Sequence, residues 1–238
     1  MTGTFINLGT ILLGTLIGTL LGARLPEGMQ QRVLMGLGLA TLVLGVDNAL
    51  EWRDTNALYV IGGILLGGLA GEALGIEDRL ESVGRRLQAR FVRKDSEDPS
   101  QHTLAEGFFV ASLLFVVGPL AVLGSIEDGL TGDYDTLATK ALLDGFAAIA
   151  LASALSWGVA FSAVTVLVYQ GAITLAAGLF EDILAEGSEA LAALTSAGGL
   201  LIIGIGLKLL DIKDVKVGNF LPALVFAPAL VGLVNLVR

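Results

Sequence analysis

Runs of about twenty apolar residues, the length that a helix needs to cross a bilayer, recur along the whole chain with short polar stretches between them. The runs are apolar on all faces, whereas the strands of a β-barrel would alternate with period two over roughly ten residues. The pattern therefore predicts an all-α polytopic membrane protein with about eight transmembrane helices. The expected spans are residues 3–23, 30–50, 57–76, 105–124, 138–156, 159–180, 190–210 and 218–237.

The segment from Ile76 to Phe91 departs from this pattern, because its apolar residues recur every three or four positions among several arginines. This spacing predicts a cytoplasmic amphipathic helix that lies on the membrane surface. By the positive-inside rule its arginines place the segment in the cytoplasm, and eight spans then put both termini outside.

The two ends of the chain resemble each other, which predicts an inverted repeat of spans one to three and six to eight. The segment 14–22 parallels 170–178, and 38–45 parallels 198–204. The alternative is coincidence among helices rich in Gly, Leu and Ile. We expect one integral membrane domain over residues 1–238, divided into a first repeat (1–76), the amphipathic helix and its loop (77–104), a central helix pair (105–157) and a second repeat (158–238).

Composition narrows the classes of function. Hydrophobic residues make up 54% of the chain and charged residues only 16%, against about 25% charged in an ordinary soluble domain. The net charge of -9 argues against nucleic acid as a partner. The sequence contains no cysteine and one histidine, His102, so thiolate sites are excluded and a histidine-based triad has almost nothing to be built from. We expect no enzyme and no cofactor, and the composition indicates no particular metal.

Glycine is abundant, with 32 residues, and small residues let membrane helices approach closely. Gly14, Gly18 and Gly22 form a stripe that predicts tight helix–helix contact, either within the chain or in a dimer. This favours a homo-oligomer, most simply a homodimer, with membrane lipid as the other partner.

Several polar side chains stand in or beside sequence that is apolar enough to enter the bilayer, where they cost free energy unless they are used or paired. Asp144 is the strongest single candidate, and the Gly118-Pro119 break would free a backbone carbonyl. Acids outnumber bases within the expected spans, so a cation or protonated amine is favoured over an anion. The candidate path for a small ion or solute is lined by Asn7, Ser112, Ser125, Glu127, Asp128, Asp144, Tyr169, Gln170 and Asn219.

Two alternatives stay open. Lys140 lies four residues before Asp144 on one helix face, so the two could simply neutralise each other. The protein would then be a non-transporting scaffold or sensor that uses the segment 76–91 on lipid or a partner. An intramembrane enzyme built on Ser125 is disfavoured because no usable histidine accompanies it.

Five stretches of the chain carry a family resemblance. They are Gly124-Ser-Ile-Glu-Asp-Gly129, Lys140-Ala-Leu-Leu-Asp-Gly145, Val168-Tyr-Gln-Gly-Ala172 and Gly199-Leu-Leu-Ile-Ile-Gly-Ile-Gly206 followed by Val217-Gly-Asn219. In this order they resemble the bacterial DUF554 family of YdfK/YqgA-like membrane proteins over nearly the whole chain. The resemblance implies a multispanning protein of the bacterial inner membrane and implies no activity.

Overall fold

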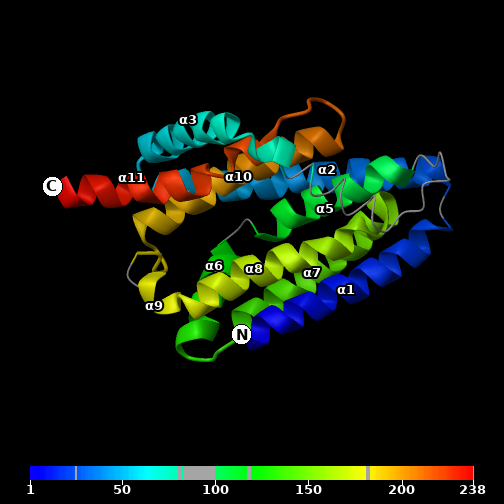
Figure 1. The fold of residues 1–238 in the computed structure, drawn as a ribbon, viewed down its shortest axis with the longest axis horizontal. Helices are drawn as coiled ribbons and strands as arrows, with labels where there is room; N and C mark the ends of the chain where they lie inside the picture. The colour runs from blue at the N-terminus through cyan, green and yellow to red at the C-terminus, as the bar shows by residue number, and fades with distance from the viewer. Residues whose placement is uncertain (25, 80–81, 83–99, 117–118, 181–182, 238) are drawn as a thin grey trace. The chain divides into compact units, whose positions relative to one another are not determined.

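The computed structural model describes residues 1–24, 26–79, 82, 100–116, 119–180 and 183–237, and every regular element within these ranges is a helix (Figure 1). The α-helices are α1 (Thr2–Gly22), α2 (Glu27–Ala49), α3 (Ala57–Leu74), α5 (Ser100–Val116), α6 (Pro119–Leu130), α7 (Asp135–Leu155), α8 (Ser162–Leu175), α9 (Ala177–Phe180), α10 (Glu189–Leu209) and α11 (Ala223–Val237). Three 3-10 helices join them: η1 (Leu50–Asp54), η2 (Ser156–Phe161) and η3 (Val217–Phe220).

Six helical segments of the described chain are long and apolar enough to cross a membrane, or up to seven if the bent pair α5 and α6 forms one span. The all-α membrane class is thereby confirmed, while the count of eight stays a prediction. The axes of α5 and α6 differ by 63°, which agrees with a broken span, although Gly118 itself lies outside the described residues. Most of the expected amphipathic helix, residues 80–81 and 83–91, also lies outside them.

One of the six segments folds back on itself. It runs from Asp135 to Leu175, and its 41 residues would form a straight helix about 60 Å long. Asp144 and Gln170 would then be separated by about 39 Å, yet both lie within hydrogen-bonding distance of Asn7. The chain therefore reverses between α7 and α8, at η2, where Ser156 has a φ of 62°.

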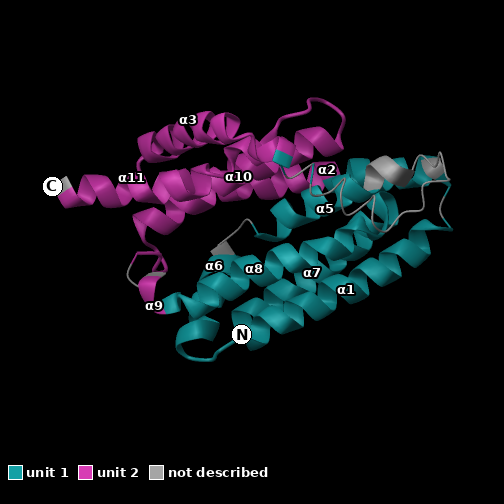
Figure 2. Ribbon diagram, viewed as in Figure 1, with its two compact units in different colours: residues 1–37, 79–116, 120–177 teal, residues 38–78, 117–119, 178–238 magenta. Residues whose placement is uncertain are grey.

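The chain packs as two compact units, coloured in Figure 2. Unit 1 contains residues 1–37, 79–116 and 120–177, and unit 2 contains residues 38–78, 117–119 and 178–238. The predicted division into two repeats and a central pair follows other boundaries and stays a prediction.

In unit 1 the glycine stripe of α1 packs against α7. A Cβ atom at Gly14, Gly18 or Gly22 would overlap the backbone carbonyl oxygens of Gly145, Ile149 and Ser153, respectively. Without side chains at these positions the two backbones come into direct contact, which is how membrane helices gain dispersion energy in lipid. The stripe is thus used within the chain, so it does not support a dimer contact.

The opposite face of α1 carries large apolar side chains that are exposed. Leu13, Leu16 and Leu20 are 62%, 57% and 62% exposed. Contiguous apolar surface of this kind is uncommon on soluble monomers and suits contact with lipid tails. Helix α1 therefore has a tightly packed inner face and an outer face that suits contact with lipid.

In unit 2, as in unit 1, small residues allow helices to pack closely. Gly63, Gly67 and Gly71 of α3 contact Ala227, Ala223 and Asn219, and these three lie in or just before α11. Gly45 of α2 and Gly199 of α10 each lie against the other's carbonyl oxygen. The α3–α11 and α2–α10 pairs therefore build the core of this unit.

Candidate functional site

A buried ion pair lies on α7. Lys140 and Asp144 are separated by one helical turn, and they are only 6% and 8% exposed. The Nζ atom of Lys140 donates a hydrogen bond to Oδ2 of Asp144. The ion pair between Lys140 and Asp144, which their spacing of four residues allows, is therefore formed in the structure.

Two further helices complete this site with amide side chains. Nδ2 of Asn7, on α1, donates to Oδ2 of Asp144 at 2.9 Å and to Oε1 of Gln170, on α8, at 3.4 Å. Asn7 and Gln170 are both fully buried. We define these four residues, Asn7, Lys140, Asp144 and Gln170, as the central cluster. The structure thus brings together three of the predicted path residues.

The central cluster is incompletely hydrogen-bonded. Within the described residues, Oδ1 of Asn7 and Nε2 of Gln170 have no partner, nor do the hydroxyls of Thr4 and Thr174. Thr4 precedes Asn7 by three positions, and Thr174 follows Gln170 by four, so each shares a helix face with its amide. Sequence reasoning missed both threonines, although this spacing could have indicated them.

Asp128 is another of the predicted path residues, and it lies outside the central cluster. The sequence places it in a hydrophilic stretch after span four, whereas α6 continues to Leu130 and buries it to 5% exposure. Its Oδ2 atom accepts from the backbone N–H of Gly3 at 3.1 Å and lies 2.7 Å from the α-amino group of Met1. Glu127, its neighbour, is exposed. Asp128 therefore joins α6 to the start of α1.

Three predicted path residues of unit 1, Ser112, Ser125 and Tyr169, lie outside the central cluster. Ser112 shares a 2.9 Å hydrogen bond with Thr165, which links α5 to α8. The buried hydroxyl of Ser125 donates to the backbone oxygen of Ala121, in its own helix, at 2.6 Å. Tyr169 is half-buried on α8, next to Gln170.

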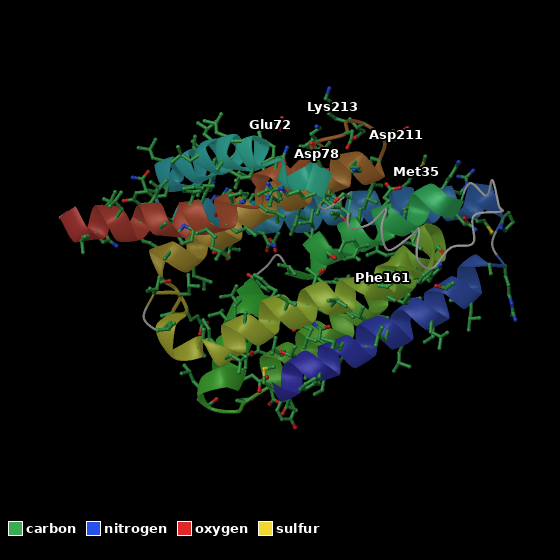
Figure 3. The ribbon with its side chains drawn as sticks, in the orientation of Figure 1. Met35, Glu72, Asp78, Phe161, Asp211 and Lys213 are labelled. Atoms are coloured by element: carbon green, nitrogen blue, oxygen red, sulfur yellow. The ribbon has the colours of Figure 1, made fainter. Side chains whose placement is uncertain are left out.

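Asn219 belongs to unit 2, where it joins η3 to the end of α3. Its Nδ2 atom donates to Glu72 at 2.6 Å, and its Oδ1 atom accepts from the backbone N–H of Glu77 at 2.8 Å. Glu77 is 2% exposed and accepts in return from the backbone N–H of Gly218 at 2.5 Å. In Figure 3, Glu72 and Asp78 mark this end of α3. Sequence reasoning missed Glu77, which stands where a surface helix was expected.

We predict that this reciprocal pair stabilises unit 2. Glu77→Gln should lower the free energy of unfolding by roughly 1–3 kcal/mol, because a charged acceptor of a buried N–H is lost. Asp78→Asn is the matched control, since Asp78 lies one residue away, its side chain is 75% exposed, and it contacts Lys216 only at 4.0 Å. Thermal unfolding in detergent would measure both variants. Equal melting temperatures of Glu77→Gln and Asp78→Asn would contradict a stabilising role for the Glu77 carboxylate.

The described residues contain no group of three or more His, Cys, Asp or Glu side chains that could hold a metal ion.

Comparison with known proteins identifies one family profile and two relatives that cover nearly the whole chain. The sequence profile described as "Protein of unknown function (DUF554)" matches residues 2–232. The "Uncharacterized membrane protein YdfK" of Bacillus subtilis (strain 168) is 32% identical over 238 residues, which cover 99% of this chain and 97% of that protein. The "Uncharacterized protein YqgA" of Escherichia coli (strain K12) is 31% identical over 225 residues, 94% of each chain. No solved structure matches.

Proposed function

We propose that this protein, which belongs to the DUF554 family, is a multi-pass membrane protein that moves a small ion, a cation or protonated amine being favoured. The path would run through the central cluster of unit 1. The protein would reside in the bacterial inner membrane, with both termini outside.

The observation that carries the proposal is the incomplete hydrogen bonding around a buried ion pair. Lys140 and Asp144 lie in a segment that is apolar enough to cross a membrane, where charged groups cost several kcal/mol and usually mark ion or substrate pathways. A buried ion pair offsets its desolvation only when its geometry is good and additional hydrogen bonds satisfy its remaining donors and acceptors. Here Asn7 and Gln170 each keep one unpartnered polar atom within the described chain, and these atoms are available to a transported species or its water.

The charge distribution favours a cation. Asp144 supplies the carboxylate, and the ammonium of Lys140 already occupies the position against Oδ2 where a transported cation would sit. The unpartnered Oδ1 of Asn7 adds an acceptor beside it. An incoming ammonium or proton would compete with Lys140 for the same oxygen.

Two features support the finer architecture within this proposal. The reversal at η2 divides the 41-residue segment into two crossings, which, with the bent α5–α6 pair counted as one span, makes eight. The helices that the inverted repeat would relate also pack in pairs: α1 with α8 and α3 with α11, and α2 with α10. Secondary transporters are commonly built from such repeats.

The test is flux into sealed proteoliposomes for a panel of cations that includes protons and small amines. Asp144→Asn should abolish the flux that wild type shows, because the carrier carboxylate is gone. Lys140→Gln/Asp144→Asn should abolish it as well, and this double variant leaves no unpaired charge that could disturb folding. Size-exclusion profiles in detergent would confirm that both variants are folded.

The matched control is Asp47→Asn, since Asp47 is an exposed carboxylate near the end of α2. It should transport as wild type does. If the Lys140→Gln/Asp144→Asn variant carries a cation at the wild-type rate, Asp144 is not the carrier. If wild type moves nothing on the panel, the alternative is favoured: a scaffold or sensor in which Lys140 and Asp144 are only a structural pair.

A further inference from the structure

The buried face of α1 carries polar side chains along most of its length. Thr4, Asn7, Thr15 and Thr19 stand at intervals of three, eight and four residues on one helical face. Each has a side-chain oxygen with no hydrogen-bond partner in the described chain. Thr4 and Asn7 are 0% exposed and Thr15 is 3% exposed. We call these four residues the α1 polar stripe.

The stripe differs from the ordinary behaviour of threonine in a helix. A threonine hydroxyl usually donates to a carbonyl three or four residues earlier in its own helix. Thr10, which lies off the stripe, does so, with Oγ1 2.9 Å from the backbone oxygen of Asn7. The stripe threonines leave this bond unmade, so their hydroxyls are the atoms that require another partner.

The dimensions of the stripe suit a chain of water molecules. From Thr4 to Thr19 the helix rises about 22 Å, which is most of the hydrocarbon thickness of roughly 30 Å. Thr15 and Thr19 are one turn apart, a rise of about 6 Å, and one water with two hydrogen bonds of about 2.8 Å bridges such a gap. On α8, Gln170 and Thr174 add two more unpartnered polar atoms beside the Asn7 end.

One residue interrupts the stripe. Ile11 lies one turn beyond Asn7 on the same face and is 0% exposed. An apolar constriction closes a narrow path by excluding water, and this is a known way to gate a pore. Ile11 stands between the central cluster on one side and Thr15 and Thr19 on the other.

We propose that the ion moved by this protein is the proton, that it travels along water held by the α1 polar stripe to Asp144, and that Ile11 is the hydrophobic gate of this path. The inference rests on the proposed function and specifies its substrate. The proton passes between Asp144 and neighbouring water, and no covalent bond other than O–H is made or broken.

The geometry favours the proton over a metal cation. Metal cations such as Mg²⁺ and Ca²⁺ require six or more oxygens around one point, whereas the stripe offers single oxygens spaced about one or two turns apart. A chain of hydrogen-bonded water needs only donors and acceptors in sequence, which hydroxyl and amide groups provide.

The experiment measures proton flux into proteoliposomes that contain a trapped pH-sensitive dye, with valinomycin and K⁺ to clamp the membrane potential. Thr15→Val should lower the flux about tenfold, the factor that corresponds to one lost hydrogen bond in the path. Thr15→Ser, which keeps the hydroxyl, should retain it. Ile11→Ser should raise the flux several-fold by admitting water to the gate. Thr10→Val is the control off the stripe and should behave as wild type.

Ile11→Val is the second gate variant, in case Ile11→Ser does not fold, and it should also raise the flux because it removes one methyl group from the gate. Equal proton flux in wild type, Thr15→Val and the folded gate variant would overturn the inference. If a metal cation or amine then still moves in a way that requires Asp144, the proposed function survives without the proton path. If neither protons nor any other cation moves, both proposals fail.

Discussion

Lys140→Met should destabilise the protein by about 3–5 kcal/mol, because it leaves the buried carboxylate of Asp144 without its counter-charge. Among the described residues, Asn7 would then be the remaining donor to that carboxylate, at 2.9 Å. The double variant Lys140→Met/Asp144→Leu should lie close to wild type in stability. It removes both charges together, and replacing a buried pair by apolar residues of similar volume is often neutral or stabilising.

Thermal and denaturant unfolding of the two variants in detergent would measure this difference. The matched control is Lys208→Met, because Lys208 is also near a carboxylate, at 3.3 Å from Asp214, but that partner is 76% exposed and water screens the pair. A single variant as stable as the double one would contradict the assignment of Lys140 as the counter-charge of Asp144. Lys140→Met/Asp144→Leu has a second use, because the proposed function requires it, like Lys140→Gln/Asp144→Asn, to be folded and inactive.

Gly18→Leu should be the most damaging substitution on the inner face of α1, with a loss of about 3 kcal/mol or more, the upper end of overpacking costs. A Cβ atom at Gly18 would overlap the backbone carbonyl of Ile149 and lie 2.9 Å from Cβ of Ala152, and a backbone carbonyl cannot turn aside as a flexible side chain does. The two helices would have to separate, which removes the close contact that holds them together in lipid.

Gly9→Leu is the matched control on the same helix, because a Cβ atom at Gly9 would meet nothing within 4 Å. It should be neutral or slightly stabilising, since leucine favours the helix by up to about 1 kcal/mol relative to glycine. The measurement is the melting temperature of each purified variant, together with its yield in the membrane fraction. Similar behaviour of the two variants would show that α1 and α7 do not pack through Gly18.

The sequence was most informative where a feature is local. Membrane class follows from the length and apolarity of the runs, because the bilayer imposes both. Span three was expected to begin at residue 57, and Asn56, directly before it, caps α3 by accepting from the N–H of Leu58 at 3.0 Å. The pairing of Lys140 with Asp144 was foreseen as an alternative, since four residues bring two side chains onto one helix face.

The sequence was least informative where residues distant in the chain meet. Asn7 lies 137 positions from Asp144 and 163 from Gln170, and no helical periodicity relates three separate helices. Asn219 was grouped with Asp144 by residue type, whereas its hydrogen bonds go to Glu72 and Glu77 in unit 2. Asp128 was expected in a polar stretch after span four, and the extension of α6 instead buries it beside Gly3.

The amino-acid sequence by itself determined that this protein is a helical membrane protein of the DUF554 family with polar groups at membrane depth, because hydrophobic length and motif order are properties of the chain alone. Only the tertiary structure decided which of those groups meet. The close approach of α1 to α7 through glycine, and the reversal of the chain at η2, bring Asn7, Asp144 and Gln170 together. Which oxygens and nitrogens stay unpartnered follows from that packing, and both the proposed site and the proposed proton path rest on them.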